Sequence, residues 1–249
     1  MNCLDVNLQI GRACVPQYGQ AATVAELFQA LDGTGITRGV VWHVAQRDGG
    51  PDIGNALVSE AIASDDRALG CWSLVPPQTD RDVMTEDFFD RMRAGRIVAL
   101  RAFPDAHRYQ LGRVTFGSFL DEVADRQIPL LLSLRLGLDW PGVYRLLAEY
   151  PTLTVVLCEL GLWGQDRMTW PLLAEYPNVY LESSLVSLEA GGLEAVVAAY
   201  GAERILFGSG FPLHYPHAAV LALLHAELSA ADREKIAGGN LRRLLGEVA

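Results

Sequence analysis

The chain has 249 residues, half of them hydrophobic, and can bury about 70–75% of its unfolded surface, so a single domain over residues 1–249 is expected. Its 20 Lys and Arg against 30 Asp and Glu give a formal net charge of −10, which repels polyanions and excludes nucleic acid as an expected partner. No basic start precedes an apolar run, and no apolar stretch approaches about 18 residues, so we expect a cytoplasmic protein with no membrane partner.

Short apolar or β-branched runs alternate along the chain with stretches of helical period, which is typical of βα units around a parallel sheet. Helices are predicted at Thr23–Leu31, which begins with a capping box of Thr23 and Glu26, and at Phe116–Arg126. Eight strand–helix units predict an α/β fold, the closed (β/α)8 TIM barrel. The predicted strands are Cys3–Ile10, Gly39–Val44, Gly70–Val75, Ile97–Phe103, Pro129–Leu134, Thr154–Glu159, Val179–Ser184 and Arg204–Gly208.

The hexapeptide LLAEYP occurs twice, at Leu146–Pro151 and at Leu172–Pro177. Each copy closes a predicted helix and leads into the next predicted strand. The proline stops the helix because it cannot continue the backbone hydrogen-bond pattern. We interpret the repeat as one solution to the same packing problem used at two places in the barrel.

The last predicted strand lies in the segment RILFGSGFP, Arg204–Pro212. This segment closely resembles the last barrel strand of the amidohydrolase-related family, the amidohydrolase 2 group of metal-dependent hydrolases and decarboxylases that includes aminocarboxymuconate-semialdehyde decarboxylase. NVYLESS at Asn178–Ser184 is similar to that family's seventh strand, and IAGGNLRRLLG at Ile236–Gly246 to its closing helix. The resemblance covers nearly the whole chain. It implies a TIM barrel whose site lies at the carboxyl ends of the strands.

The resemblance also implies positions for metal ligands and catalytic histidines, and this chain carries other residues there. The family's last strand reads roughly RILFGSDYP, and its metal-binding aspartate falls on Gly210. The family's histidines in the first, fifth and sixth strands fall on Asn7, Gln9, Ser133 and Glu159. Amide side chains such as those of Asn7 and Gln9 are poor zinc ligands compared with imidazole. The sequence therefore predicts the family's scaffold without a metal ion or other cofactor.

A different metal site is an alternative. Asp5, Glu159 and one loop histidine would provide two carboxylates and one imidazole. No two of these ligands lie at a close spacing in the sequence that would support such a site.

Glu159 is the first candidate for catalysis. It lies at the end of an apolar strand, where desolvation is expected to raise its pKa and suit it to general acid or base chemistry. The alternative is a structural ion pair with a nearby arginine.

Arg101 and Arg135 are the natural partners, and either can bind a substrate carboxylate through two parallel N–H groups. If the extended conformation continues past Ser133, Arg135 points into the barrel as Ser133 does. Arg135 is alternatively a solvated loop residue.

Histidines form the second group of candidates. His43 ends the second predicted strand and is either a proton-transfer catalyst or a packed core residue. His214 and His217 follow the last strand in a loop at the same end, and His107 follows the fourth. We predict Glu159, Arg101 and His43 as catalytic. The predicted substrate-binding residues are Asp5, Asn7, Gln9, Ser133, Arg135 and His214.

Two classes of function fit this set of residues. The first is a metal-independent hydrolase or lyase that acts on a small polar or carboxylated substrate at the barrel mouth. The second is a non-catalytic relative that binds a ligand or partner in the same pocket. A homodimer through outer helices is possible in either class. Trp163 and Trp170 are candidates for that contact or for the pocket entrance.

Overall fold

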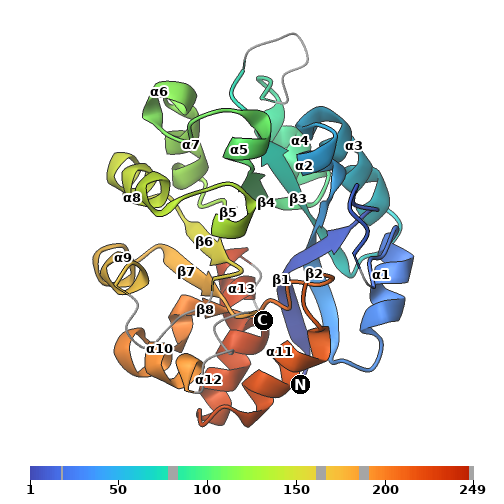
Figure 1. The fold of residues 1–249 in the computed structure, drawn as a ribbon, viewed down its shortest axis with the longest axis vertical. Helices are drawn as coiled ribbons and strands as arrows, with labels where there is room; N and C mark the ends of the chain where they lie inside the picture. The colour runs from blue at the N-terminus through green and yellow to red at the C-terminus, as the bar shows by residue number, and fades with distance from the viewer. Residues whose placement is uncertain (18, 78–83, 161–166, 185–190, 247–249) are drawn as a thin grey trace.

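Eight parallel strands form one sheet in sequential order, β1 to β8, and helices surround it (Figure 1). This computed structural model describes residues 1–17, 19–77, 84–160, 167–184 and 191–246. The predicted TIM barrel is confirmed. The strands are β1 (Cys3–Ile10), β2 (Ile36–His43), β3 (Ala68–Leu74), β4 (Ile97–Ala102), β5 (Leu130–Ser133), β6 (Val155–Cys158), β7 (Val179–Glu182) and β8 (Ile205–Leu206).

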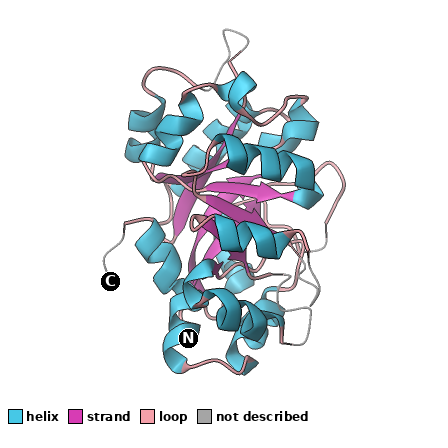
Figure 2. Ribbon diagram, turned by 90° about the vertical axis from the view of Figure 1, so that its left-hand side faces the viewer, coloured by secondary structure: helices cyan, strands magenta, loops and turns pink. Residues whose placement is uncertain are grey.

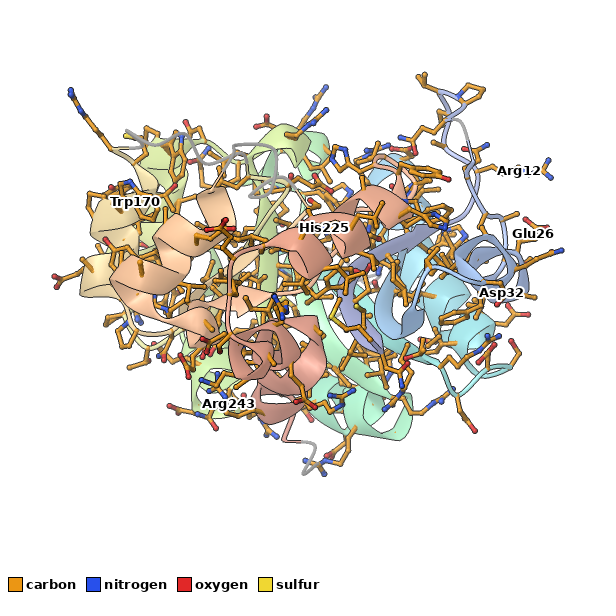
Figure 3. The ribbon with its side chains drawn as sticks, turned by 90° about the horizontal axis from the view of Figure 1, so that it is seen from below. Arg12, Glu26, Asp32, Trp170, His225 and Arg243 are labelled. Carbon is orange, nitrogen blue, oxygen red and sulfur yellow. The ribbon has the colours of Figure 1, made fainter. Side chains whose placement is uncertain are left out.

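The helices lie outside the strands, so the sheet is enclosed when the molecule is seen from the side (Figure 2). Trp170 and Glu26 label opposite sides of this outer layer (Figure 3). No helix in the described ranges is long and apolar enough to span a bilayer. The α-helices are α1 (Val24–Leu31), α2 (Ala45–Asp48), α3 (Pro51–Ile62), α4 (Phe88–Ala94), α5 (Pro104–His107), α6 (Arg113–Phe116), α7 (Phe119–Asp125), α8 (Trp140–Glu149), α9 (Thr169–Glu175), α10 (Gly192–Tyr200), α11 (Pro216–His225), α12 (Ala230–Glu234) and α13 (Asn240–Leu244).

The barrel is closed between β1 and the segment that follows the short strand β8. Val6 N–H donates to the Phe207 carbonyl at 2.9 Å, and Gln9 N–H donates to the Phe211 carbonyl at 3.0 Å. Asp5 adds a side-chain bond, because its Oδ2 accepts the Ser209 N–H at 2.9 Å. These bonds join the first and last strand segments of the chain.

Side chains alternate between two apolar clusters, as expected for barrel strands. One cluster fills the space between the strands and the outer helices. The other fills the barrel interior, with Val156 and Cys158 of β6 and Tyr180 of β7 among its members. Leu241 of α13 belongs to the interior cluster, and a Cβ at Gly238 would lie 3.2 Å from Leu4 at the start of β1. Helix α13 and the turn that precedes it, Lys235–Gly239, therefore cover the amino ends of the strands and leave the carboxyl ends for polar side chains.

Local predictions are confirmed at several points. Thr23 Oγ1 accepts the Glu26 N–H at 3.1 Å, although Glu26 Oε2 accepts from Ala22 rather than from Thr23. In both LLAEYP copies the tyrosine N–H donates to the first leucine's carbonyl at 2.9 Å and ends the helix. The predicted helix Phe116–Arg126 is wrong in its first turn. Gly117 has φ 52° and ψ −131°, a non-helical conformation, so one helix ends at Phe116 and another begins at Phe119.

Of the two tryptophans considered for a dimer contact, the structure describes Trp170 and not Trp163. Trp170 of α9 stacks on Tyr200 of α10, with ring centroids 5.6 Å apart. Trp163 lies outside the described residues. The homodimer stays a prediction.

Candidate active site at the carboxyl ends of the strands

Polar side chains follow the apolar interior at the carboxyl ends of the strands. In β4, Arg101 lies between Ala99 and Phe103, which both pack in the interior cluster. In β5, Ser133 continues the inward series of Leu131. Strand alternation therefore directs these polar groups to the barrel axis. Arg101 has no exposed surface, and Ser133 is 3% exposed.

Four of the predicted residues form one buried network. Ser133 Oγ donates to Glu159 Oε2 at 2.7 Å, and Asn7 Nδ2 donates to Glu159 Oε1 at 3.3 Å. Arg101 Nη1 donates to Asn7 Oδ1 at 2.8 Å, while its Nη2 lies 3.7 Å from Glu159 Oε1. The guanidinium carbon lies 4.6 Å from the centre of the Trp42 ring. The network therefore joins β1, β4, β5 and the end of β6 through one carboxylate.

Glu159 enters this network because its backbone departs from the extended conformation. Val155 and Leu157 point outward and Val156 and Cys158 point inward, so alternation alone would direct Glu159 outward. Glu159 instead has φ 57°, in the left-handed region. Such a conformation costs a non-glycine residue on the order of 1–3 kcal/mol and needs support from its surroundings.

Glu182, at the end of β7, provides that support and is absent from the predicted site. Its Oε2 accepts the Glu159 N–H at 2.9 Å, and its Oε1 accepts the Ser184 N–H at 2.6 Å. Gly208 leaves room for this carboxylate, since a Cβ there would lie 2.3 Å from Glu182 Oε1. A sequence signal existed, because Tyr180 points inward and Glu182 follows two residues later in the same strand.

Two buried carboxyl groups near this network have raised pKa values. Burial raises the pKa of Glu182 to about 7, and the negative charge of Asp5 adds to the effect. Burial likewise raises the pKa of Asp5 to about 6, although hydrogen bonds from Ser209 and Asn7 oppose the change. Both carboxyl groups are therefore expected to titrate closer to neutral pH than free carboxyl groups do.

Asp5 and Gln9 lie at the edge of the network and not within it. Both Asp5 oxygens accept backbone N–H groups, from Asn7 at 2.8 Å and from Ser209 at 2.9 Å. Gln9 Nε2 donates to Gln17 Oε1 at 3.2 Å. Asp5 thus supports the backbone of Asn7, and Gln9 faces the loop that follows β1.

His43 is not joined to the network by any hydrogen bond among the described residues. Trp42 points into the barrel, so His43 points away from it. Its Nδ1 accepts the Ala45 N–H at 3.0 Å. A Cβ at Gly11 would lie 2.7 Å from the His43 ring, so the glycine leaves room for the ring. Burial lowers its pKa. The geometry matches the packed residue that was the alternative for His43.

Arg135 does not continue the strand, so the condition for an inward direction by parity with Ser133 is not met. The chain turns into a 3-10 helix at Leu134–Leu136, and Ser133 Oγ accepts the Arg135 N–H at 3.2 Å. Arg135 instead lines a polar cavity of about 410 Å³ beside the barrel mouth, together with Asp105 and Asp139.

His214 lies at the mouth, on the loop between β8 and α11. Gly210 has φ 63°, and a Cβ added to it would lie 2.8 Å from His214 Cδ2 and 3.3 Å from Ser184 Oγ. Burial lowers the His214 pKa, the charge of Glu159 opposes that change, and the charge of Arg135 adds to it. His214 therefore occupies the space beside Gly210 and faces the predicted site.

The described side chains at the mouth do not make a set of ligands suited to a divalent cation. Within the described ranges, no three His, Cys, Asp or Glu side chains are grouped so that they could hold one, and Asp5, Glu159 and the loop histidines are included in that statement. Asp5 and Glu182 are occupied by backbone N–H groups. The Arg101 guanidinium, 3.7 Å from Glu159, repels a second cation. The described side chains can support acid–base and anion-binding chemistry.

The fold and the site together define a TIM-barrel protein with a polar network at the carboxyl ends of its strands. The family model described as Amidohydrolase matches residues 15–246, so the chain belongs to the amidohydrolase 2 family. The sequence matches no curated protein.

Solved structures share the fold over nearly the full length. An uncharacterised TIM-barrel protein, Bb4693 from Bordetella bronchiseptica, is 17% identical with a TM-score of 0.76, and 99% of each chain is covered. 2,6-Dihydroxybenzoate decarboxylase from Rhizobium is 18% identical with a TM-score of 0.73, and 99% of each chain is covered. Dihydroxybenzoic acid decarboxylase from Polaromonas sp. JS666, with bound manganese and the inhibitor 2-nitroresorcinol, is 16% identical with a TM-score of 0.74, covering 99% of this chain and 97% of that one.

Proposed function

We propose that the protein is a metal-independent hydrolase or lyase for a small polar or carboxylated substrate. The observation that supports this function is the buried network in which Asn7, Ser133 and Arg101 hold one carboxylate, that of Glu159. Two of the similar structures are decarboxylases of dihydroxybenzoic acids. Small aromatic carboxylates are therefore the first substrates to test, and a lyase reaction is the first chemistry.

The network assigns a role to each group. Glu159 transfers a proton, and Ser133 and Asn7 fix the two oxygens of its carboxyl group. Arg101 binds the substrate anion and stabilises negative charge that develops during the reaction. In a decarboxylation, Glu159 would start the step as the protonated acid. The bond to the carboxyl carbon breaks, CO₂ leaves, and the electron pair left on the ring carbon takes the Glu159 proton; the Glu159 carboxylate then regains a proton from water. In a hydrolysis, Glu159 would instead accept a proton from the attacking water.

The test is turnover by protein from which metal has been removed with a chelator and whose metal content has been measured by mass spectrometry. Benzoates with hydroxyl groups, including 2,6-dihydroxybenzoate, and simple lactones form the substrate panel. We expect turnover without metal, and a loss of at least about 100-fold in kcat for Glu159→Gln, because removing a positioned proton donor costs about that much. Turnover that requires added manganese or zinc, or a Glu159→Gln variant with full activity, would contradict the proposal.

One observation favours a second function, ligand binding without catalysis. Both Glu159 oxygens already accept hydrogen bonds inside the protein, and the residue is only 4% exposed. In that case a carboxylate would raise the unfolding temperature, no member of the panel would be turned over, and Glu159→Gln would bind the carboxylate as the wild type does.

A further inference from the structure

Ser73 and Arg101 lie side by side on the inner wall of the barrel. Ser73 of β3 and Arg101 of β4 are Cα partners in the parallel ladder. Both continue inward series, since Cys71 and Ala99 two residues earlier pack in the interior cluster. Neither residue has any exposed surface. Their polar atoms therefore face the same interior space at the level of the network around Glu159.

Three polar atoms of this pair have no hydrogen-bond partner among the described residues. They are Ser73 Oγ, Arg101 Nε and Arg101 Nη2. The third guanidinium nitrogen, Nη1, donates to Asn7. Nη2 lies 3.7 Å from Glu159 Oε1, which is an ion-pair distance but too long for a hydrogen bond. Buried polar atoms without partners are rare because each costs free energy of folding. Three of them at one place indicate a group that they bind.

The arrangement of the donors selects the chemistry of that group. Nε and Nη2 share one edge of the guanidinium plane, and their parallel N–H groups match the two oxygens of a carboxylate. Trp42 covers a face of the guanidinium, with 4.6 Å from the guanidinium carbon to the ring centre, so this contact does not use that edge. The Ser73 hydroxyl can donate a further hydrogen bond to the same anion.

We propose that the Nε–Nη2 edge of Arg101 and the Ser73 hydroxyl bind the carboxylate of a small ligand, which makes Ser73 a substrate-binding residue. The inference deepens the proposed function and rests on it for the identity of the site. It also predicts selectivity. A carboxamide presents its own N–H donors to one of the arginine donors, so the site rejects the neutral isostere of a carboxylate that it accepts.

The test uses formate, acetate and benzoate as anions and benzamide as the neutral isostere, with thermal unfolding of the full chain as the measurement. Arg101 has no exposed surface, so neighbouring side chains must move before a ligand binds, and samples are equilibrated before heating. We expect at least one of the carboxylates to raise the unfolding temperature of the wild type progressively as its concentration increases, and benzamide to leave it unchanged. Failure of all three carboxylates to bind would overturn the inference.

Ser73→Ala separates binding from folding. The variant should bind the carboxylate about tenfold more weakly, because it loses one hydrogen bond to a charged group. Without ligand, its unfolding temperature should equal or exceed that of the wild type, because the substitution removes a buried hydroxyl without a partner. Ser133→Ala is the matched control, since its hydroxyl donates to Glu159 at 2.7 Å and its loss should lower the ligand-free unfolding temperature.

Two results would count against Ser73 specifically. Unchanged carboxylate affinity in Ser73→Ala would show that the hydroxyl does not contact the ligand. A fall in its ligand-free unfolding temperature like that of Ser133→Ala would show that the hydroxyl already has a partner in the folded protein. Carboxylate binding that weakens in Ser73→Ala, in a protein that turns over no substrate, would overturn the proposed catalysis and support the binding site.

Discussion

Replacing Arg101 with leucine is expected to lower the free energy of unfolding by about 3–5 kcal/mol, because one partner of a buried ion pair is removed and the other remains. The Glu159 carboxylate would keep its bonds to Ser133 and Asn7 but lose the only guanidinium near it in the described structure. Asn7 Oδ1 would lose its donor, and Trp42 would lose its contact with the cation. Chemical denaturation monitored by tryptophan fluorescence measures the change.

A double variant distinguishes loss of charge pairing from loss of packing. Arg101→Leu combined with Glu159→Leu removes both charges, so part of the lost stability should return. Arg101→Leu alone should also abolish carboxylate binding. If the single variant is as stable as the wild type, or if the double variant is less stable by the sum of both single effects, the ion pair contributes nothing to folding and the predicted coupling is wrong.

The second large effect is a dependence of stability on pH that arises from Glu182. Its folded-state pKa of about 7 lies above the value of 4.5 for the free side chain, so the folded protein binds this proton more tightly than the unfolded chain. Stability from this group is therefore greatest below about pH 4.5 and falls as the pH rises through 7. Between pH 5 and pH 8 the loss is on the order of 2 kcal/mol. Asp5, with a pKa of about 6, acts in the same direction.

The measurement is the difference in unfolding free energy between the wild type and Glu182→Gln across this pH range. A difference is needed because burial lowers the pKa values of His43, His107 and His214, so these groups make the protein less stable as the pH falls. The stability of Glu182→Gln relative to the wild type should therefore increase as the pH rises, because only the wild type loses the contribution of Glu182. Glu203→Gln, which changes an exposed carboxyl group paired with Lys235, is the control and should run parallel to the wild type. A Glu182→Gln curve parallel to the wild type would contradict the prediction.

The sequence pattern was sufficient to predict the barrel because short apolar runs alternate with stretches of helical period, as in βα units around a parallel sheet that is buried on both faces. Residues such as Val156 and Cys158, or Val155 and Leu157, face opposite sides in the structure as their spacing requires. Arg101 and Ser133 followed from the same alternation. The ends of the helices were predicted less accurately. The break at Gly117 depends on its backbone conformation, which the helical period of the sequence does not contain.

The site itself depended on features that alternation does not contain. Glu159 points inward through a left-handed backbone, and its predicted place came from the family resemblance rather than from parity. The direction of Arg135 does not follow from strand parity, because the strand ends at Ser133 and a 3-10 helix begins. Glu182 was not predicted because it ends the seventh strand, where the family resemblance implies no metal ligand. Its contact with the Glu159 N–H joins two strands, and no local pattern specifies that contact.

The packing around Gly210 has an evolutionary consequence. A Cβ at this position would lie 2.8 Å from the His214 ring and 3.3 Å from Ser184, so an aspartate there requires the His214 side chain to move or to be replaced by a smaller one. Positions 210 and 214 should therefore vary together among homologues. We expect glycine at 210 to accompany a bulky ring at 214, and aspartate at 210 to accompany a residue that leaves the space open. Intermediates with only one of the two changes should be rare, which would make the two arrangements separate lineages within the family.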